Sequence, residues 1–158
     1  MNKLGCILVA LVLLIPGVVA AAEQPPRTFV LVVGVNGSAD KSFAPRKFAE
    51  QDARNLFEVF NDPRRQPLKT EARLLLGKAD DPAGLATRAN ILKNLNWLVD
   101  EAAADDQVIV VLLGRAAPLA GRTCYITANA AYEKLADTGL TLQEMTRALE
   151  KLASRHVC

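Results

Sequence analysis

Few side chains in this sequence could act as a nucleophile, a general base or a metal ligand. The 158-residue chain has three cysteines and a single histidine, His156, which excludes any site built on two histidine ligands. His156 and Cys158 would share one face of a strand, but a structural zinc site needs four ligands and this pair supplies two. Ser154 is close to His156 in sequence, yet no acidic residue is placed to orient the histidine. A serine triad therefore has no support.

Two other motifs match ligand sites only in part. Gly34-Val-Asn-Gly37 follows a predicted strand, but neither the dinucleotide-binding nor the P-loop glycine pattern is present, which favours tight-turn glycines. Asp80 and Asp81 lack the several further oxygen ligands that calcium requires, which favours a solvated loop. The sequence therefore predicts no metal site and no cofactor.

The N-terminal segment, residues 1–22, has the composition of a secretory signal peptide. One basic residue precedes an apolar run over residues 7–15, and three alanines at positions 20–22 offer a small-residue cleavage site. We therefore expect an exported protein with no membrane association after cleavage. Residues 23–27 are expected to form a linker and residues 28–158 a single domain.

The cysteines of this domain leave two alternatives open. Export implies an oxidising compartment, in which Cys124 and Cys158 could form a disulfide. Two cysteines without a framework spacing are also typical of buried free thiols in strands.

Composition and charge fit one globular domain. The chain is 51% hydrophobic and 23% charged, which excludes a disordered or coiled-coil protein. Its formal net charge of +2 is too balanced to suggest electrostatic nucleic-acid binding. A protein or peptide partner is the more compatible expectation.

Strands and helices are predicted to alternate along the domain. Strands are expected over Thr28–Val35, Glu71–Leu76, Gln107–Leu113 and Thr123–Thr127, and helices over Pro45–Asn61, from Thr87 onward and from the Thr141–Glu144 capping box onward, with Arg155–Cys158 beginning another strand. This order is typical of a three-layer α/β/α sandwich around a mostly parallel sheet. Sites in such sheets lie at the carboxyl ends of strands, which here precede Gly34–Ala44, Gly77–Ala86 and Gly114–Arg122. The last helix is expected to bury Leu142 and Met145.

Five segments spread over the domain carry a resemblance to a known family. They are Phe29–Asn36, Phe48–Ala53, Ala86–Leu92, Asp105–Gly114 and Leu135–Leu142. In this order they resemble the large-subunit region of caspase-like cysteine peptidases, the group of metacaspases and bacterial caspases. The resemblance implies a sheet with a histidine–cysteine dyad, the histidine in an S-G-H-G turn after the third strand and the cysteine in a D-x-C-H-S-G-like segment after the next strand.

Neither position of the implied dyad is filled. Aligning residues 113–116 with S-G-H-G places Arg115 at the histidine position, where a guanidinium that keeps its proton cannot act as a base, although it could favour a thiolate. Residues 155–158 match the strand before the cysteine motif, so Cys158 is not assigned as the nucleophile. We therefore expect an exported caspase-like domain, incomplete at its C-terminus and proteolytically inert as given. It would be either a fragment or a pseudoenzyme that serves as an interaction module.

Asp52 is the residue for which the resemblance implies a binding role. It matches the aspartate of the family's N-D-A helix start, which in metacaspases helps to shape a pocket for a basic P1 side chain. The alternative is a first-turn acid that the helix macrodipole favours. A competing function is a small exported binding domain of flavodoxin-like shape without protease ancestry. Because the last strand stops at Cys158, we also expect an exposed sheet edge through which the chain could self-associate.

Overall fold

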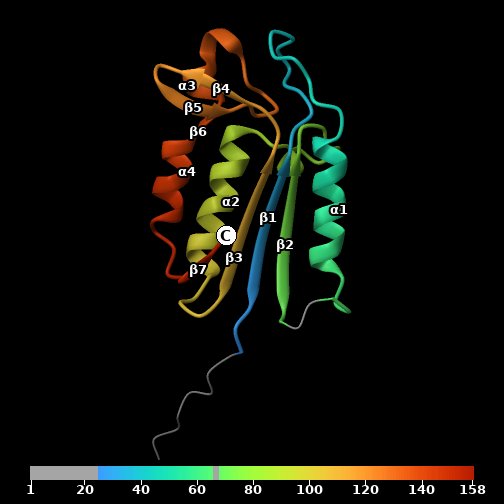
Figure 1. Cartoon of the computed structure of the whole chain (residues 1–158), viewed down its shortest axis with the longest axis vertical. Helices are drawn as coiled ribbons and strands as arrows, with labels where there is room; N and C mark the ends of the chain where they lie inside the picture. Colours follow the sequence, from blue (N-terminus) through green and yellow to red (C-terminus); the bar gives the residue numbers. More distant parts are fainter. Residues whose placement is uncertain (1–24, 66–67) are drawn as a thin grey trace, which may run out of the picture.

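Within the described residues, 25–65 and 68–158, the computed structural model has a central sheet of four parallel strands (Figure 1). The predicted signal peptide, residues 1–22, lies outside the described residues. The strand order is β2-β1-β3-β7, and β1 is paired along its whole length on both sides. The strands are β1 (Thr28–Gly34), β2 (Thr70–Leu76), β3 (Gln107–Leu113) and β7 (His156–Val157). Their carboxyl ends point to the upper edge of the molecule in Figure 1.

Helices cover both faces of this sheet. α1 (Ala49–Asn61) packs over β1 and β2, while α2 (Arg88–Glu101) and α4 (Leu142–Leu149) lie on the opposite side (Figure 1). Because side chains alternate along a strand, β1 supplies both apolar cores. Its buried residues are Phe29, Leu31 and Val33 on the α2 side, and Val30 and Val32 on the α1 side. The three-layer α/β sandwich predicted from the order of elements is confirmed.

Side-chain caps confirm two of the predicted helix starts. The Thr87 hydroxyl accepts a hydrogen bond from the backbone N–H of Asn90 at the start of α2. Thr141 and Glu144 form the predicted capping box of α4, in which each side chain accepts a backbone N–H of the other residue. The starts of α2 and α4 are thus determined by residues within three positions of the cap.

The start of α1 was predicted wrongly. The helix begins at Ala49 and not at Pro45, because contacts with the loop after β1 hold the intervening residues in a loop. The carbonyl of Asn36 accepts the backbone N–H of Arg46 at 2.6 Å, and the Asn36 side-chain oxygen accepts the N–H of Glu50 at 3.2 Å. A long-range contact therefore replaces the local cap of α1.

Gly34 brings α1 close to β1. We expected a tight-turn glycine here, but neither Gly34 nor Gly37 has a positive φ. A Cβ on Gly34 would lie 2.5 Å from the Cβ of Ala53 and 2.7 Å from the carbonyl oxygen of Ala49. The glycine is required because the helix backbone touches the strand end.

The buried face of α4 differs in part from the prediction. Met145 packs against the core as expected, whereas Leu142 is 52% exposed. Leu140, which directly precedes the cap, is buried in the same core as Met145. This pair has the arrangement of a hydrophobic staple.

A second, antiparallel sheet lies beyond the carboxyl ends of the parallel strands (Figure 1). It consists of β4 (Ala116–Leu119), β5 (Arg122–Tyr125) and β6 (Leu140–Thr141). The expected loop Gly114–Arg122 is therefore mostly a hairpin, whose turn residues Ala120 and Gly121 have φ values of 46° and 77°. The sequence did not predict this hairpin because alanine rarely adopts a positive φ and so does not mark a turn. Pro118 also argued against a strand, although proline is tolerated in an edge strand such as β4. The short elements are η1 (Pro82–Gly84), η2 (Tyr132–Lys134) and α3 (Leu135–Thr138).

Arg27 belongs to the folded domain and not to the linker predicted over residues 23–27. Its backbone N–H donates to Asp106 Oδ1 at 2.7 Å, and its guanidinium donates to Asp106 Oδ2 at 3.2 Å. The same guanidinium donates to the carbonyl of Glu101 at 2.8 Å. These bonds join the start of β1 to the turn that precedes β3.

The edge of the sheet at β3 is only partly covered. β7 pairs with Gln107 and Val108, and no described strand continues this pairing toward Leu113. Each helix among residues 25–65 and 68–158 is too short or too polar to span a bilayer.

Candidate functional site

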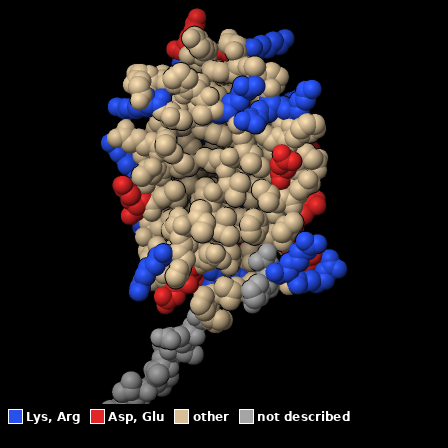
Figure 2. Space-filling view, in the orientation of Figure 1, with Lys and Arg blue, Asp and Glu red and all other residues tan. Residues whose placement is uncertain are grey.

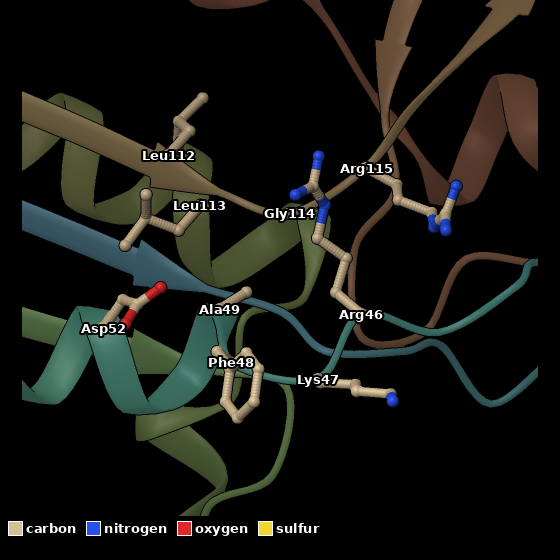
Figure 3. A pocket seen from close by; sticks show the side chains of 9 residues that line it. All are labelled: Arg46, Lys47, Phe48, Ala49, Asp52, Leu112, Leu113, Gly114 and Arg115. Carbon is tan, nitrogen blue, oxygen red and sulfur yellow. The ribbon is translucent and has the colours of Figure 1, made fainter.

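A pocket of about 650 Å³ lies where α1 begins and β3 ends. Figure 3 shows side chains from the loop before α1, the first turn of α1 and the end of β3 around it. It is lined by Arg46, Lys47, Phe48, Ala49, Asp52, Leu112, Leu113, Gly114 and Arg115. The pocket therefore lies at the carboxyl end of the parallel sheet, where such folds place their sites.

Arg115 reaches this pocket because the end of β3 is fixed from two sides. The carbonyl of Leu113 accepts the backbone N–H of Val35 at 2.8 Å and the hydroxyl of Tyr125 at 2.9 Å. Gly114 follows, and a Cβ at this residue would lie 2.7 Å from the Tyr125 hydroxyl oxygen. Arg115 thus lies at the same end of the sheet as the loop after β1, as expected from the sequence.

The loop before α1 brings a second group of side chains to the pocket. Asn36 and Glu50 exchange hydrogen bonds across the loop, since the Asn36 N–H also donates to Glu50 Oε1 at 3.1 Å. This exchange holds Arg46, Lys47 and Phe48 ahead of the helix. Arg46 extends toward Gly114 in Figure 3, and Phe48 is 68% exposed.

The charged side chains of the pocket have no charged partner among the described residues. Arg46, Lys47 and Arg115 supply three positive charges and Asp52 one negative charge, and none of these side chains takes part in an ion pair. Four arginines outside the pocket do form ion pairs, such as Arg88, which donates to Glu144 between α2 and α4. The side chains that line the pocket therefore include more basic than acidic groups.

Asp52 lies in the first turn of α1, where the helix macrodipole stabilises a negative charge. In Figure 3 its carboxylate points toward the ends of β1 and β3, beside Leu113. The structure thus brings Asp52 and Arg115 to one pocket, although they are 63 positions apart in the sequence. Asp52 is the lone acid among three cations.

Neither domain cysteine lines the pocket, and both are free thiols in the structure. Cys124 is fully buried in β5, and burial, together with the negative charge of Glu144, raises the pKa of its thiol. Cys158 is exposed, unlike the buried thiol expected in the alternative to a disulfide. It lies beside the amino half of β3, where its carbonyl accepts the N–H of Val110 at 2.9 Å.

The remaining candidates from the sequence, Ser154, His156 and Asp81, lie outside the pocket. The Ser154 hydroxyl donates to the carbonyl of Asp106 at 2.6 Å and accepts the backbone N–H of His156 at 3.1 Å, which fixes the start of β7. His156 is exposed at the amino end of β3, away from the pocket. Asp81 caps η1 by accepting the N–H of Ala83 at 2.9 Å. No group of metal-ligating side chains occurs among residues 25–65 and 68–158.

Sequence reasoning missed the basic residues in front of α1. Because the helix was expected to begin at Pro45, Arg46 and Lys47 fell inside its predicted range and were not considered as site residues. The signal that could have found them is a pair of basic residues next to the loop that follows the first parallel strand. Recognising it requires knowing that this loop and the end of β3 meet.

Comparisons with known proteins found a similar fold but no related sequence. No family model matches this chain, and no match was found among curated proteins. Among solved structures, the fold is similar to that of protein GSU0716 from Geobacter sulfurreducens, with a TM-score of 0.62 and 16% sequence identity. The match covers 84% of this chain and 47% of that protein, so the chain spans just under half of its length. At this identity the likeness shows a shared α/β architecture.

Proposed function

We propose that this chain is a caspase-like domain without peptidase activity, which uses the pocket at the end of β3 to bind a protein or peptide segment. The observation that carries the proposal is the position of Arg115. It occupies the loop after β3, where the resemblance implies a catalytic histidine, and it lines a pocket that includes no histidine and no cysteine. Export through residues 1–22 stays a prediction of the sequence.

The chemistry of the pocket supports binding and not cleavage. Peptide hydrolysis by a cysteine peptidase needs a thiolate and a base that takes and returns a proton. Arg115 keeps its proton at physiological pH, so it can supply charge but not base catalysis. The buried Cys124 thiol has a raised pKa and faces away from solvent, which makes it a poor nucleophile.

The surroundings of the pocket support a peptide as the bound group. Apolar side chains from Phe48 and Leu113 lie next to charged ones, so the pocket could hold both parts of a mixed segment.

The purified chain should not cleave peptide reporters with Arg, Lys or Asp at the cleavage position, with or without calcium. The reason is the absence of a base and of an accessible thiolate in the pocket. Initial rates measured by fluorescence release, before and after treatment with a thiol alkylating reagent, check this expectation. Cleavage that Cys124→Ala or Cys158→Ala abolishes would contradict the proposal.

The variant Arg115→His tests whether a histidine at this position is sufficient for peptidase activity. Arg115→His restores the residue type that the resemblance implies, but it should give no proteolysis because no nucleophile adjoins the new base. A gain of peptidase activity in Arg115→His would mean that one of the cysteines reaches the pocket. The proposal that the domain lacks peptidase activity would then be wrong.

A further inference from the structure

We propose that this chain forms a two-fold symmetric dimer in which the outer edge of β2 pairs antiparallel with the same edge of a second copy. This surface lies on the opposite side of β1 from β3, and the inference is independent of the proposed binding function. It follows from the backbone groups that β2 leaves unpaired, from the lack of features that protect a sheet edge, and from the charges of Glu71 and Arg73.

The alternation of backbone groups along β2 shows which of them point outward. The carbonyl of Lys69 accepts the N–H of Thr28 at 2.9 Å, so the odd-numbered residues of this strand face β1. No described strand pairs with β2 on its other side. The even-numbered residues, whose backbone groups point to that side, include Thr70, Ala72 and Leu74.

The end of this outer edge next to Leu76 is already covered. The Leu76 carbonyl points outward and accepts the N–H of Ala86 at 2.7 Å, and Leu76 forms an isolated parallel bridge with Leu85. Before this bridge, no described backbone group bonds to the outward N–H and carbonyl groups. We call residues 70–74 the β2 edge.

The β2 edge lacks the features by which sheet edges usually avoid pairing. Its register with β1 is continuous from Thr70 to Leu76, so it contains no bulge, and it contains no proline. The edge strand β4 of the second sheet, in contrast, contains Pro118. The charges of the β2 edge, on Glu71 and Arg73, are of opposite sign and can pair across an interface.

Backbone direction and charge together favour one register between two β2 edges. A two-fold axis at Ala72 places Ala72 opposite its own copy and Thr70 opposite Leu74, so that the outward backbone groups meet. Glu71 then lies opposite Arg73 of the second copy, in the kind of pair whose side chains come closest. Moving the axis to Glu71 or to Arg73 would place two glutamates or two arginines opposite each other. The axis at Ala72 is therefore favoured over its neighbours.

Contacts with α2 hold the Arg73 side chain beside the β2 edge. Its guanidinium carbon lies 3.8 Å from the centroid of the Trp97 ring, and its Nη1 donates to Asn94 Oδ1 at 3.1 Å. No described acidic side chain forms an ion pair with Arg73. Because a guanidinium has five N–H donors, Arg73 can keep these contacts and also donate to Glu71 of a second copy.

The overall charge of the chain offers little resistance to self-association. The formal net charge is +2, and Figure 2 shows basic and acidic side chains interspersed around the border of the view. Repulsion between two copies is therefore weak, and the local pairing of Glu71 with Arg73 decides the electrostatic contribution.

Sedimentation velocity of the purified chain should show a monomer–dimer equilibrium with a dissociation constant of about 10 μM, since strand pairing buries little surface. Ala72→Pro removes the N–H at the centre of the interface and should weaken dimerisation about thirtyfold. An edge strand tolerates proline where its N–H faces solvent, so the monomer should stay folded. Glu71→Arg and Arg73→Glu each create like-charge pairs and should weaken dimerisation about tenfold.

An equal mixture of the Glu71→Arg and Arg73→Glu chains tests the register directly. Each arginine of one chain then lies opposite a glutamate of the other, so native mass spectrometry should detect a heterodimer that forms about as readily as the parent dimer. Arg147→Glu reverses an exposed charge on α4, which packs on α2 and β5, and should leave dimerisation unchanged. Glu71 also pairs within its own chain with Arg27 and Lys69, at 3.7 and 3.4 Å, so unfolding curves of each variant accompany these measurements.

Three results would overturn the inference. The first is a parent chain that stays monomeric at concentrations of about 200 μM. The second is a dimer that Ala72→Pro leaves unchanged while this variant unfolds like the parent, because the contact would then lie elsewhere. The third is a mixture of folded Glu71→Arg and Arg73→Glu chains that associates no better than either chain alone.

Discussion

Replacing Gly34 with alanine should lower the free energy of unfolding by about 3 kcal/mol, because the added methyl group has no room between β1 and α1. The nearest atoms would be the Cβ of Ala53 at 2.5 Å and the backbone carbonyl oxygen of Ala49 at 2.7 Å. Neither neighbour is the movable end of a long side chain. Relief therefore requires α1 to shift away from the sheet, which would also displace the loop that carries Arg46. Urea unfolding followed by circular dichroism measures the loss.

Gly37 provides the matched control for this substitution. A Cβ there would lie no closer than 3.5 Å to its nearest neighbour, the Cβ of Pro45, and its φ is not positive. Gly37→Ala should therefore change the free energy of unfolding by less than about 1 kcal/mol, with a slight gain from a less flexible unfolded chain. Equal losses in the two variants would contradict the close approach of α1 to Gly34.

Asp106→Ala should cost about 3 kcal/mol of stability, because this buried carboxylate holds the start of β1 to the turn before β3. Asp106 accepts the backbone N–H of Arg27 and that of Ala103, at 2.7 and 2.9 Å, and pairs with the Arg27 guanidinium at 3.2 Å. Alanine would leave both N–H groups without their acceptor. Asp105→Ala, at the exposed neighbouring aspartate, should change stability by no more than about 0.5 kcal/mol.

The Asp106 contribution should also depend on pH in a defined direction. Burial acts to raise the pKa of Asp106, but the N–H groups of Ala103 and Arg27 and the Arg27 charge outweigh it and bring the pKa below its ordinary value of 3.8. A carboxyl group with a lowered folded-state pKa stabilises the fold above its unfolded pKa and loses this effect as the pH falls through the folded pKa. The stability difference between the parent and Asp106→Ala should stay constant above about pH 5 and shrink below pH 3.8.

Unfolding curves of the parent and Asp106→Ala at a series of pH values from neutral to acidic check this dependence. A difference that grows on acidification would mean that the neutral carboxyl, and not the carboxylate, makes the stabilising contacts. A difference of the size of the Asp105→Ala effect would mean that the Arg27–Asp106 contacts add little.

Periodic patterns and local caps were the features that the sequence predicted well. Residues 28–34 and 107–113 are continuous apolar runs, which only a sheet covered on both faces accommodates, and both are parallel strands. Thr87 and the Thr141–Glu144 box could be identified because an N-cap bond spans only two or three residues. Information of this range is present in any short window of sequence.

The hairpin of β4 and β5 was missed because its signals are weak. Its strands have four residues each, one contains Pro118, and the turn places Ala120 at a positive φ that alanine rarely adopts. The hairpin is stable because Cys124 and its neighbours pack into a separate small core with residues from other segments. Such packing is not visible in the local sequence.

By itself, the sequence determined the order of strands and helices, the parallel direction of the main strands and the edge of the sheet at which a site should lie. These properties follow from hydrophobic periodicity and from the handedness of strand–helix–strand connections, which depend on the chain alone. The composition of the site was decided only by the tertiary structure. Arg46, Asp52 and Arg115 come from separate segments, and they meet because the exchange between Asn36 and Glu50 and the bond from Tyr125 to Leu113 fix two loops across the sheet edge. The charge of a pocket is a sum over side chains that share a place in space, so no single stretch of the sequence contains it.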